Sequence, residues 1–375
     1  MIYLDNAATS YPKPECVHTR VDEVLRKIGG NPGRGSHRMA LEAGRVIFST
    51  REALARLLNV PDASRLVFTK NATEAVNIAL KGLVRRGDHV VTTSFEHNSV
   101  AKTLRRLERE GVSVTRVRGR RPDLVEACEI EEALTDRTKL VAVVHASNVF
   151  GTIQPVAEIA EVLRKRGVLL MVDGAQTVGA LEVDLGSLGA DVFVGTGHKA
   201  LFGPQGTGFL YLAEGVEPEP LVDGGTGELD DLLEIPDRLE AGTMNTPGIG
   251  GLGAGVGFVL DEGVARIREH EVRLVRRIMD GLAGIGGISI LGTPEPDERA
   301  SLVTFNIDGI APEEVGTRLD RDFAVMVRSG AHCAPSAHRM AGTYPKGAVR
   351  VSPGYFNTED DIEAFLQAVA SIAAG

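Results

Sequence analysis

The sequence predicts an α/β protein with a large domain built on a mostly parallel sheet and a smaller α+β domain towards the C-terminus. Strand-like and helix-like patterns alternate from about residue 65 to residue 211, which is typical of βαβ units. Short apolar segments without polar alternation are typical of strands covered on both faces of such a sheet. Five occur, at residues 66–68, 89–91, 140–144, 168–172 and 192–194.

The flanking segments complete the two predicted domains. Helical patterns at residues 15–28 and 37–58 precede the alternating region, and glycine-rich sequence follows it at residues 223–227 and 241–257. We expect a change of domain in this glycine-rich part of the chain. The expected large domain covers residues 15–245, and the expected small domain combines residues 1–14 with residues 246–375.

The C-terminal part has the mixed pattern of an α+β domain. It predicts helices at residues 263–282, 312–321 and 358–372, and strands at residues 288–291, 302–306, 324–327 and 348–351.

Residues 248–253 fit the pattern G-x-G-x-x-G, which is weak evidence for a nucleotide site. No apolar strand precedes them, and the next acidic residue, Asp261, follows too soon to be the partner expected about 20 residues on. Thr246 as the N-cap and Pro247 at the first helical position instead predict a helix whose small residues allow close packing.

Composition and charge exclude several classes of protein. The 375 residues include 51 acidic and 41 basic side chains, and the net charge of −10 argues against nucleic-acid binding. No apolar run approaches the roughly 20 residues that span a bilayer, and the first residues have no signal-like pattern. We therefore expect a cytoplasmic protein that binds neither nucleic acid nor membrane. Three scattered cysteines are too few for a disulfide framework.

Polar residues of different chemical kinds follow each of the five apolar segments. Because ligands of parallel sheets bind outside the carboxyl ends of the strands, these loops are expected to converge on one site. A lysine that forms a Schiff base, a carboxylate beside a pyridinium nitrogen and hydroxyls that hold a phosphate are what pyridoxal phosphate needs from a protein. The loops supply these groups in segments 71–74, 96–98, 145–148, 173–176 and 196–199.

Each of these residues also has a simpler interpretation. Lys199 is compatible with a lysine that extends to the surface, and Asp173 with a turn aspartate before a glycine. Thr73 is compatible with a plain N-cap of the helical pattern at residues 74–84. A lone loop histidine such as His97 is more often structural.

Four motifs carry a resemblance to a known family: D-G-A-Q at residues 173–176, T-G-H-K at 196–199, E-A-G-T at 240–243 and R-S-G-A-H-C at 328–333. They resemble the class V aminotransferase-fold cysteine desulfurases and selenocysteine lyases, and in particular the group with a short cysteine segment. The similarity extends over nearly the whole chain. It implies a pyridoxal phosphate-dependent transferase of fold type I with a seven-stranded sheet and without a metal.

The resemblance implies roles around the cofactor. Lys199 is expected to form the Schiff base and to remove the substrate α-proton, and Asp173 to face the pyridine nitrogen. Gln176 is expected to contact the phenolic oxygen of the ring, and His97 to stack on the ring and relay protons. Thr243 is expected to reach the phosphate of the neighbouring subunit, which implies a homodimer with shared active sites. Further cofactor contacts are expected from Ala72, Thr73, Asn148, Thr196 and His198.

Arg350 is the expected partner of the substrate α-carboxylate. It lies in an otherwise apolar strand pattern, where a charge has to be paired, and a guanidinium matches both carboxylate oxygens. By the same resemblance Asn148 contacts the substrate or the ring, and Arg328 is a second basic group near the cysteine.

Cys333 is the predicted nucleophile of a sulfur-transfer step. Its glycine, proline and histidine neighbours predict an exposed thiol, although free cysteines are among the most buried residues. A thiolate near cationic groups would attack the sulfur of L-cysteine and become a persulfide, leaving L-alanine. Because the segment is short, we expect a sulfur-acceptor protein to approach it. Cys16 and Cys128 lie on helical patterns and are expected to be packing residues.

Other activities use parts of the same pattern. A selenocysteine lyase acting on L-selenocysteine, or a related epimerase or β-lyase, needs the same cofactor residues. A thiol hydrolase that pairs Cys333 with His332 or His338 would leave Lys199 and Asp173 without a role. A zinc site made of the same cysteine and histidines lacks a fourth ligand at a recognisable spacing.

Overall fold

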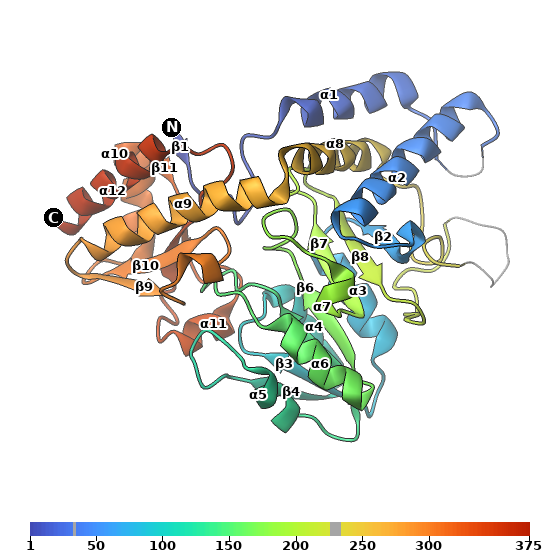
Figure 1. The fold of residues 1–375 in the computed structure, drawn as a ribbon, viewed down its shortest axis with the longest axis horizontal. Helices are drawn as coiled ribbons and strands as arrows, with labels where there is room; N and C mark the ends of the chain where they lie inside the picture. The colour runs from blue at the N-terminus through green and yellow to red at the C-terminus, as the bar shows by residue number, and fades with distance from the viewer. Residues whose placement is uncertain (33–34, 226–233) are drawn as a thin grey trace.

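The largest sheet of the computed structural model, which describes residues 1–32, 35–225 and 234–375, has seven strands in the order β2-β8-β7-β6-β5-β3-β4 (Figure 1). Strand β8 is antiparallel to both of its neighbours and all other pairs are parallel. The predicted fold class and mostly parallel seven-stranded sheet are therefore confirmed. The strands are β2 (Leu66–Thr69), β3 (His89–Thr93), β4 (Ser113–Val117), β5 (Thr138–Val144), β6 (Leu169–Asp173), β7 (Val192–Thr196) and β8 (Gly208–Leu212).

Side chains from the two faces of this sheet enter two different cores. In β5, Val141 and Val143 pack with α2, α6 and α8, whereas Leu140 and Ala142 pack with α3 and α4. Because both faces of the sheet are covered, β5 has no solvent-exposed face, and its sequence therefore does not alternate between apolar and polar residues. The elements on and around the sheet are α1 (Glu15–Glu23), η1 (Val24–Ile28), α2 (Arg38–Leu57), η2 (Ala63–Arg65), α3 (Ala72–Leu83), α4 (Asn98–Arg109), α5 (Ala127–Glu132), α6 (Val156–Arg166), α7 (Leu185–Leu188) and α8 (Thr246–Glu262).

The smaller domain contains an antiparallel sheet in the order β12-β13-β10-β9, and a parallel pair, β1 with β11. Leu4 is fully buried in the same core as Phe305 and Phe365, so the first residues of the chain pack with the C-terminal domain. The elements are β1 (Ile2–Tyr3), α9 (Val264–Ala283), β9 (Ile288–Leu291), η3 (Pro296–Glu298), β10 (Val303–Ile307), α10 (Pro312–Phe323), β11 (Val325–Met326), β12 (Arg328–Gly330), α11 (Pro335–Met340), β13 (Ala348–Val351) and α12 (Glu359–Ala373).

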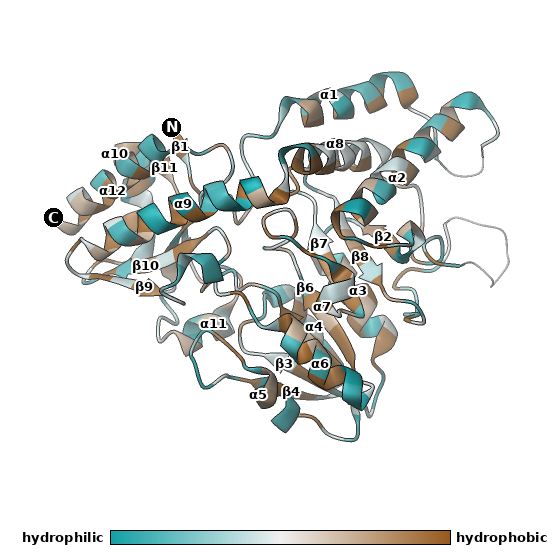
Figure 2. Cartoon of the chain, in the orientation of Figure 1, coloured by the Kyte–Doolittle hydropathy of each residue, from teal (hydrophilic) through white to brown (hydrophobic). Residues whose placement is uncertain are grey.

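Hydropathy follows this two-domain packing. Figure 2 shows hydrophilic residues on α1 and α9 and hydrophobic residues in the strands of the large sheet. Among the described helices, none has the length and apolar character needed to cross a membrane. The expected cytoplasmic location stays a prediction.

Helix α8 joins the two domains and packs against α1 and α2. Its G-x-G-x-x-G sequence lies inside the helix, where a Cβ on Gly253 would come within 2.4 Å of the Thr50 hydroxyl oxygen. Small residues therefore allow close helix packing, as expected, and no nucleotide-binding turn is formed. Since Ile249 and Leu252 of α8 belong to a core of the large sheet, the division of the chain at residue 246 stays a prediction.

Two local predictions were wrong. The N-cap of α8 is Asn245, whose side chain accepts a hydrogen bond of 3.1 Å from the Gly248 amide, and Thr246 is already helical. Cys16 and Cys128 lie on helices as expected, but both are exposed rather than packed. Helical periodicity alone did not show which face of these helices meets the core. Part of the glycine-rich segment 223–227 lies outside the described residues.

Candidate active site

A cavity of about 650 Å³ opens at the carboxyl ends of the large-sheet strands, between the two domains. Asp173, Lys199 and Cys333 all line it, which is the arrangement expected from the sequence. It brings together every predicted site residue except Thr243: Ala72, Thr73, His97, Asn148, Asp173, Gln176, Thr196, His198, Lys199, Arg328, Cys333 and Arg350.

The N-terminus of α3 provides an anion site at one side of the cavity. Asn71 caps the helix by accepting a hydrogen bond from the Glu74 amide at 3.0 Å, so Asn71 rather than Thr73 is the N-cap. The Thr73 hydroxyl is thus available to a ligand, beside the free amides and the positive end of the helix dipole. Thr196, at the end of β7, and His198 face the same cavity.

Lys199 follows β7, lines the cavity and is partly exposed. Burial lowers the pKa of its amine to about 8, although Asp173 acts in the opposite direction. A neutral amine, which is the nucleophilic form, is thus accessible near neutral pH. This environment favours the catalytic interpretation of Lys199 over a surface lysine.

His97 caps α4 through its Nδ1 atom, which accepts a hydrogen bond from the Ser99 amide at 3.1 Å. Burial lowers the pKa of His97, although Asp173 opposes the effect. The neutral ring therefore carries its proton on Nε2. Just before it, Glu96 is buried with a pKa raised to about 8 by burial, and it accepts hydrogen bonds from Thr93 and Val144.

Three residues that line the cavity have a buried polar atom without a hydrogen-bond partner among the described residues. The atoms are Oδ1 of Asn148, Nδ1 of His198 and Nε of Arg350. Unpaired buried groups are costly and rare in proteins, so a ligand with polar atoms is expected in this cavity. Asp173 is 3% exposed, and its carboxylate accepts a hydrogen bond of 3.0 Å from the Ala175 amide. These features, beside an anion site and a partly buried lysine, fit pyridoxal phosphate.

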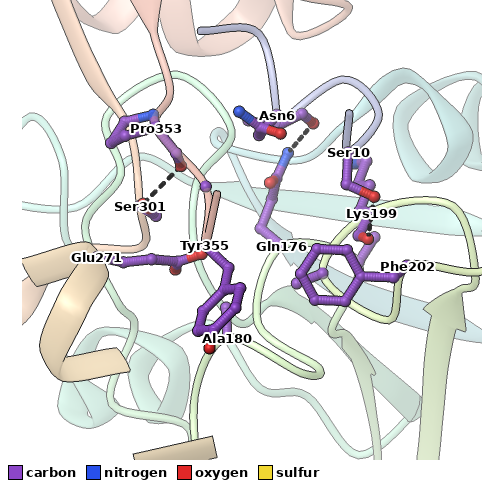
Figure 3. Close-up of a pocket in the computed structure, with 14 residues that line it drawn as sticks. Asn6, Ser10, Gln176, Ala180, Lys199, Phe202, Glu271, Ser301, Pro353 and Tyr355 are labelled. Atoms are coloured by element: carbon purple, nitrogen blue, oxygen red, sulfur yellow. Dashed lines mark hydrogen bonds between the residues drawn. The ribbon is translucent and has the colours of Figure 1, made fainter. Parts of the chain in front are cut away.

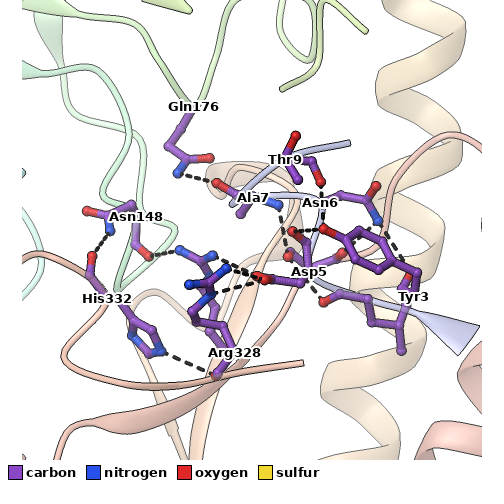
Figure 4. Close-up of polar contacts among 12 residues, drawn as sticks. Tyr3, Asp5, Asn6, Ala7, Thr9, Asn148, Gln176, Arg328 and His332 are labelled. Atoms are coloured by element: carbon purple, nitrogen blue, oxygen red, sulfur yellow. Dashed lines mark hydrogen bonds and ion pairs between the residues drawn. The ribbon is translucent and has the colours of Figure 1, made fainter. Parts of the chain in front are cut away.

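Arg350 is held by a residue whose role the sequence did not reveal. Asp5 accepts hydrogen bonds from Arg350 at 3.1 Å and from Arg328 at 2.7 Å, and thus joins β13 and β12 (Figure 4). Arg350 is 3% exposed, donates also to the Asn148 carbonyl, and keeps an unpaired Nε. Two arginines near the cavity needed a counter-charge, but sequence could not identify which of many carboxylates supplies it.

Gln176 has a different partner from the one expected at the cofactor ring. Its side-chain amide donates to the Ala7 carbonyl at 3.1 Å, which ties the loop after β6 to the N-terminal segment (Figure 4). Gln176 still lines the cavity, so a contact with the ring stays a prediction.

Cys333 is exposed, as predicted, and its backbone is fixed from the large domain. The Asn98 amide donates to the Cys333 carbonyl at 2.8 Å, and the Asn148 side chain donates to the His332 carbonyl at 2.6 Å. His332 and Cys333 have φ angles of 48° and 58°, in the left-handed region that non-glycine residues rarely adopt. Such conformations persist where surrounding contacts enforce them.

A second, smaller cavity is lined by Lys199 on one side and by residues of the small domain, including Glu271 of α9, on the other (Figure 3). Its walls include Gln176, Tyr355 and Glu271, and Glu271 is 4% exposed. Burial raises the pKa of Glu271 to about 8, and its Oε2 atom has no partner among the described residues. This acid was not identified from the sequence, because α9 gives no sign of a buried glutamate.

Thr243 lies outside the main cavity and lines another one with Leu221 and Val222. The preceding Glu240 is anchored by a buried ion pair with Arg51 at 2.8 Å. A contact of Thr243 with a neighbouring subunit's phosphate therefore stays a prediction. Among the described residues, no cluster of histidine, cysteine and acidic side chains could hold a metal ion.

Comparison with known proteins identifies the family. The aminotransferase class-V family matches residues 2–365. A probable cysteine desulfurase of Methanothermobacter thermautotrophicus is 37% identical over 99% of this chain and 94% of its own length. The apo structure of a cysteine desulfurase from Thermococcus onnurineus has a TM-score of 0.94 at 35% identity, covering 100% of this chain and 95% of that one. The cysteine desulfurase CsdA of Escherichia coli has a TM-score of 0.89 at 28% identity, covering 99% and 94%. The chain therefore belongs to the aminotransferase class-V family, as its motifs predicted.

Proposed function

We propose that this protein is a pyridoxal phosphate-dependent cysteine desulfurase that converts L-cysteine to L-alanine and passes the sulfur to Cys333. The observation that carries the proposal is that a partly buried lysine, a buried carboxylate and an exposed thiol line one cavity. The similar proteins and structures are described as cysteine desulfurases, which supports the same reaction here.

Pyridoxal 5'-phosphate is the cofactor of this family, and the cavity offers groups for each part of it. Thr73, Thr196 and His198 would hold the phosphate with the N-terminus of α3. Asp173 would pair with the pyridine nitrogen, and Lys199 would bond the aldehyde carbon. The bound cofactor draws electrons away from the α-carbon of an amino acid.

The protein's own groups would then orient the substrate and move its protons. Arg350 and Arg328 line the cavity together with Cys333, and the unpaired Nε of Arg350 remains for a carboxylate. Lys199 in its neutral form accepts the α-proton, and His97 holds a proton on Nε2.

The sulfur-transfer step needs no additional oxidant. The Cys333 thiolate attacks the sulfur of the bound cysteine, so an S–S bond forms and the carbon–sulfur bond breaks. The electron pair of that bond stays on the carbon, which takes up a proton and becomes the methyl group of L-alanine. The persulfide on Cys333 then passes its terminal sulfur to a thiol of an acceptor protein.

Replacing the three cysteines one at a time tests this proposal. All three are exposed, so Cys16→Ser and Cys128→Ser are matched controls for Cys333→Ser. We expect only Cys333→Ser to abolish cysteine-dependent release of sulfide in the presence of a reducing thiol, with alanine measured in parallel. Undiminished sulfide release by Cys333→Ser contradicts the proposal. L-selenocysteine, assayed beside L-cysteine, determines which substrate the cavity prefers.

We further propose that the protein acts as a homodimer. Thr243 lies away from this chain's own cavity, and Leu41, Phe48 and Val222 are large apolar side chains exposed at 53%, 60% and 56%. Leu41 and Phe48 are seven positions apart on α2 and therefore lie on one face of that helix, and exposed apolar surface often marks subunit interfaces. Analytical ultracentrifugation of the wild type and of Phe48→Glu tests this: a monomeric wild type contradicts it.

A further inference from the structure

Three side chains beside Cys333 form a hydrogen-bonded chain that the proposed reaction does not use. Nδ1 of His332 lies 3.2 Å from Nε2 of His338, and Nδ1 of His338 lies 2.7 Å from the Thr343 hydroxyl. At the other end, Nε2 of His332 lies 3.4 Å from the Arg328 carbonyl (Figure 4). The two histidines are 7% and 0% exposed.

The carbonyl at the end of this chain fixes the direction of every hydrogen bond. A carbonyl only accepts, so Nε2 of His332 carries the proton and its Nδ1 is an acceptor. His338 must then donate from Nε2, which leaves its Nδ1 to accept from the Thr343 hydroxyl. The opposite direction would place the lone pair of His332 Nε2 against that of the Arg328 carbonyl.

Both imidazoles are neutral in this arrangement. Burial lowers the pKa of His332 far below its ordinary value, and the nearby positive charges of Arg350 and Arg328 lower it further. Burial also lowers the pKa of His338 to about 4. His332 therefore offers no positive charge to the neighbouring thiol. The charges that face Cys333 come from Lys199, Arg328 and Arg350.

The hydrogen-bonded chain is attached to the backbone that carries the thiol. His332 and Cys333 hold left-handed φ angles, which are unfavourable for residues with a Cβ. Their carbonyls accept hydrogen bonds from Asn148 and Asn98 of the large domain, whereas the ring of His332 is hydrogen-bonded to His338 of α11. Ring and carbonyl together fix the orientation of this peptide.

We propose that His338 and Thr343 are positioning residues that, through the neutral ring of His332, hold Cys333 in the conformation required for sulfur transfer. The inference rests on the proposed role of Cys333 as the sulfur acceptor. It assigns His332 a structural role, and excludes it as the acid or base of the thiol.

Paired substitutions of the holoenzyme test this role. Gln at position 338 keeps an amide donor near the place of Nε2, whereas Leu removes it, so His338→Gln is compared with His338→Leu. Thr343→Ser keeps the hydroxyl, and Thr343→Val removes it with little change in volume. His89→Leu is the matched control, because His89 is also buried between two hydroxyls, those of Thr138 and Thr115, but lies outside the cavity.

We expect His338→Leu and Thr343→Val to lower kcat for alanine formation by about 10- to 100-fold, the scale of a small misplacement of a reacting group. KM for L-cysteine is expected to change by less than about threefold, because a misplaced thiol affects the chemical step and not the binding of the substrate. His338→Gln and Thr343→Ser are expected to restore most of kcat, and His89→Leu to leave it near the wild-type value.

Three results would overturn the inference. The first is a wild-type kcat in Thr343→Val, and the second is an equal loss of kcat in His89→Leu and His338→Leu. The third is a set of nitrogen-15 chemical shifts, from NMR spectra of the purified protein, that shows a charged His332 between pH 6 and 8. Cys333→Ser separates this inference from the proposed function. If that variant still releases sulfide, the function is wrong; if it is inactive while Thr343→Val is normal, only the positioning role is wrong.

Discussion

The strand ends of the large sheet and the segment that carries Cys333 reach the same cavity by different means. Asp173 is the last residue of the buried strand β6, and Lys199 comes three residues after the end of the neighbouring parallel strand β7, so the sheet fixes their positions. Cys333 lies in a short turn between β12 and α11, with a left-handed backbone and contacts from distant residues. One side of the site is therefore set by secondary structure, and the other by tertiary hydrogen bonds.

This difference separates two kinds of sensitivity. Changes at the strand ends should remove chemistry but leave the sheet intact, because a core of apolar side chains supports it. Substitutions around the cysteine segment should alter both the position of the thiol and the stability of the protein, because charged and polar contacts hold this segment in place.

The largest expected effect is on chemistry at the strand ends. Lys199→Ala removes the amine that bonds the cofactor and moves the α-proton, and we expect alanine formation to fall by about 10²–10⁴-fold. The rate at which iodoacetamide alkylates Cys333 should remain within about twofold of the wild-type rate, because the backbone that carries this thiol is held by other contacts. The exposed Lys70 provides the control Lys70→Ala. Substantial turnover in Lys199→Ala would contradict the view that the strand ends supply the chemistry.

The next effect concerns the carboxylate that pairs both arginines. Asp5→Asn leaves the buried Arg350 without its counter-charge, which typically destabilises a protein by about 3–5 kcal/mol. We expect a lower urea midpoint and a higher KM for L-cysteine. Asp297→Asn, which breaks an exposed pair with Arg276, should change stability by only about 0–1 kcal/mol. Equal losses in the two variants would show that Asp5 is no more than a surface partner.

Glu271 at the domain junction gives a pH-dependent effect. Its pKa in the folded protein is raised to about 8, above the 4.5 of an ordinary glutamate. Between these values the folded state holds a proton that the unfolded state releases, so this group lowers stability as pH rises from about 4.5 to 8. Glu271→Gln should reduce that decline and be more stable than wild type at pH 8. Urea midpoints from pH 5 to 9 measure it; parallel curves for both proteins contradict it.

The smallest expected effect is at the N-terminus of α3. Asn71→Ala removes the cap of the helix that faces the phosphate position, and should lower the free energy of unfolding by about 1 kcal/mol. Asn245→Ala removes an equivalent cap from α8, away from the main cavity. We expect similar losses of stability in the two variants, but weaker binding of pyridoxal phosphate only in Asn71→Ala. Equal affinities would show that the cap does not support the anion site.

Much of the site was predictable because parallel strands impose a simple geometry. Successive apolar segments predicted the strands, and the polar residues after them met at one edge of the sheet. The motif resemblance added Cys333 and Arg350, which lie in the small domain and which strand periodicity could not have connected to Lys199. Periodicity and motifs did not show which partners Asp5, Glu271 and His338 contact.

The order of residues along the chain was enough to predict the fold class, the mostly parallel sheet and the residues at its strand ends. Local periodicity and strand direction are properties of neighbouring residues, so they can be read along the chain. Three features became visible only in the folded chain: Asp5 pairs with arginines more than 300 positions away, His338 is hydrogen-bonded to His332, and Cys16 and Cys128 face solvent. These depend on which surfaces meet once the two domains pack, and burial and pairing exist only after that contact is made.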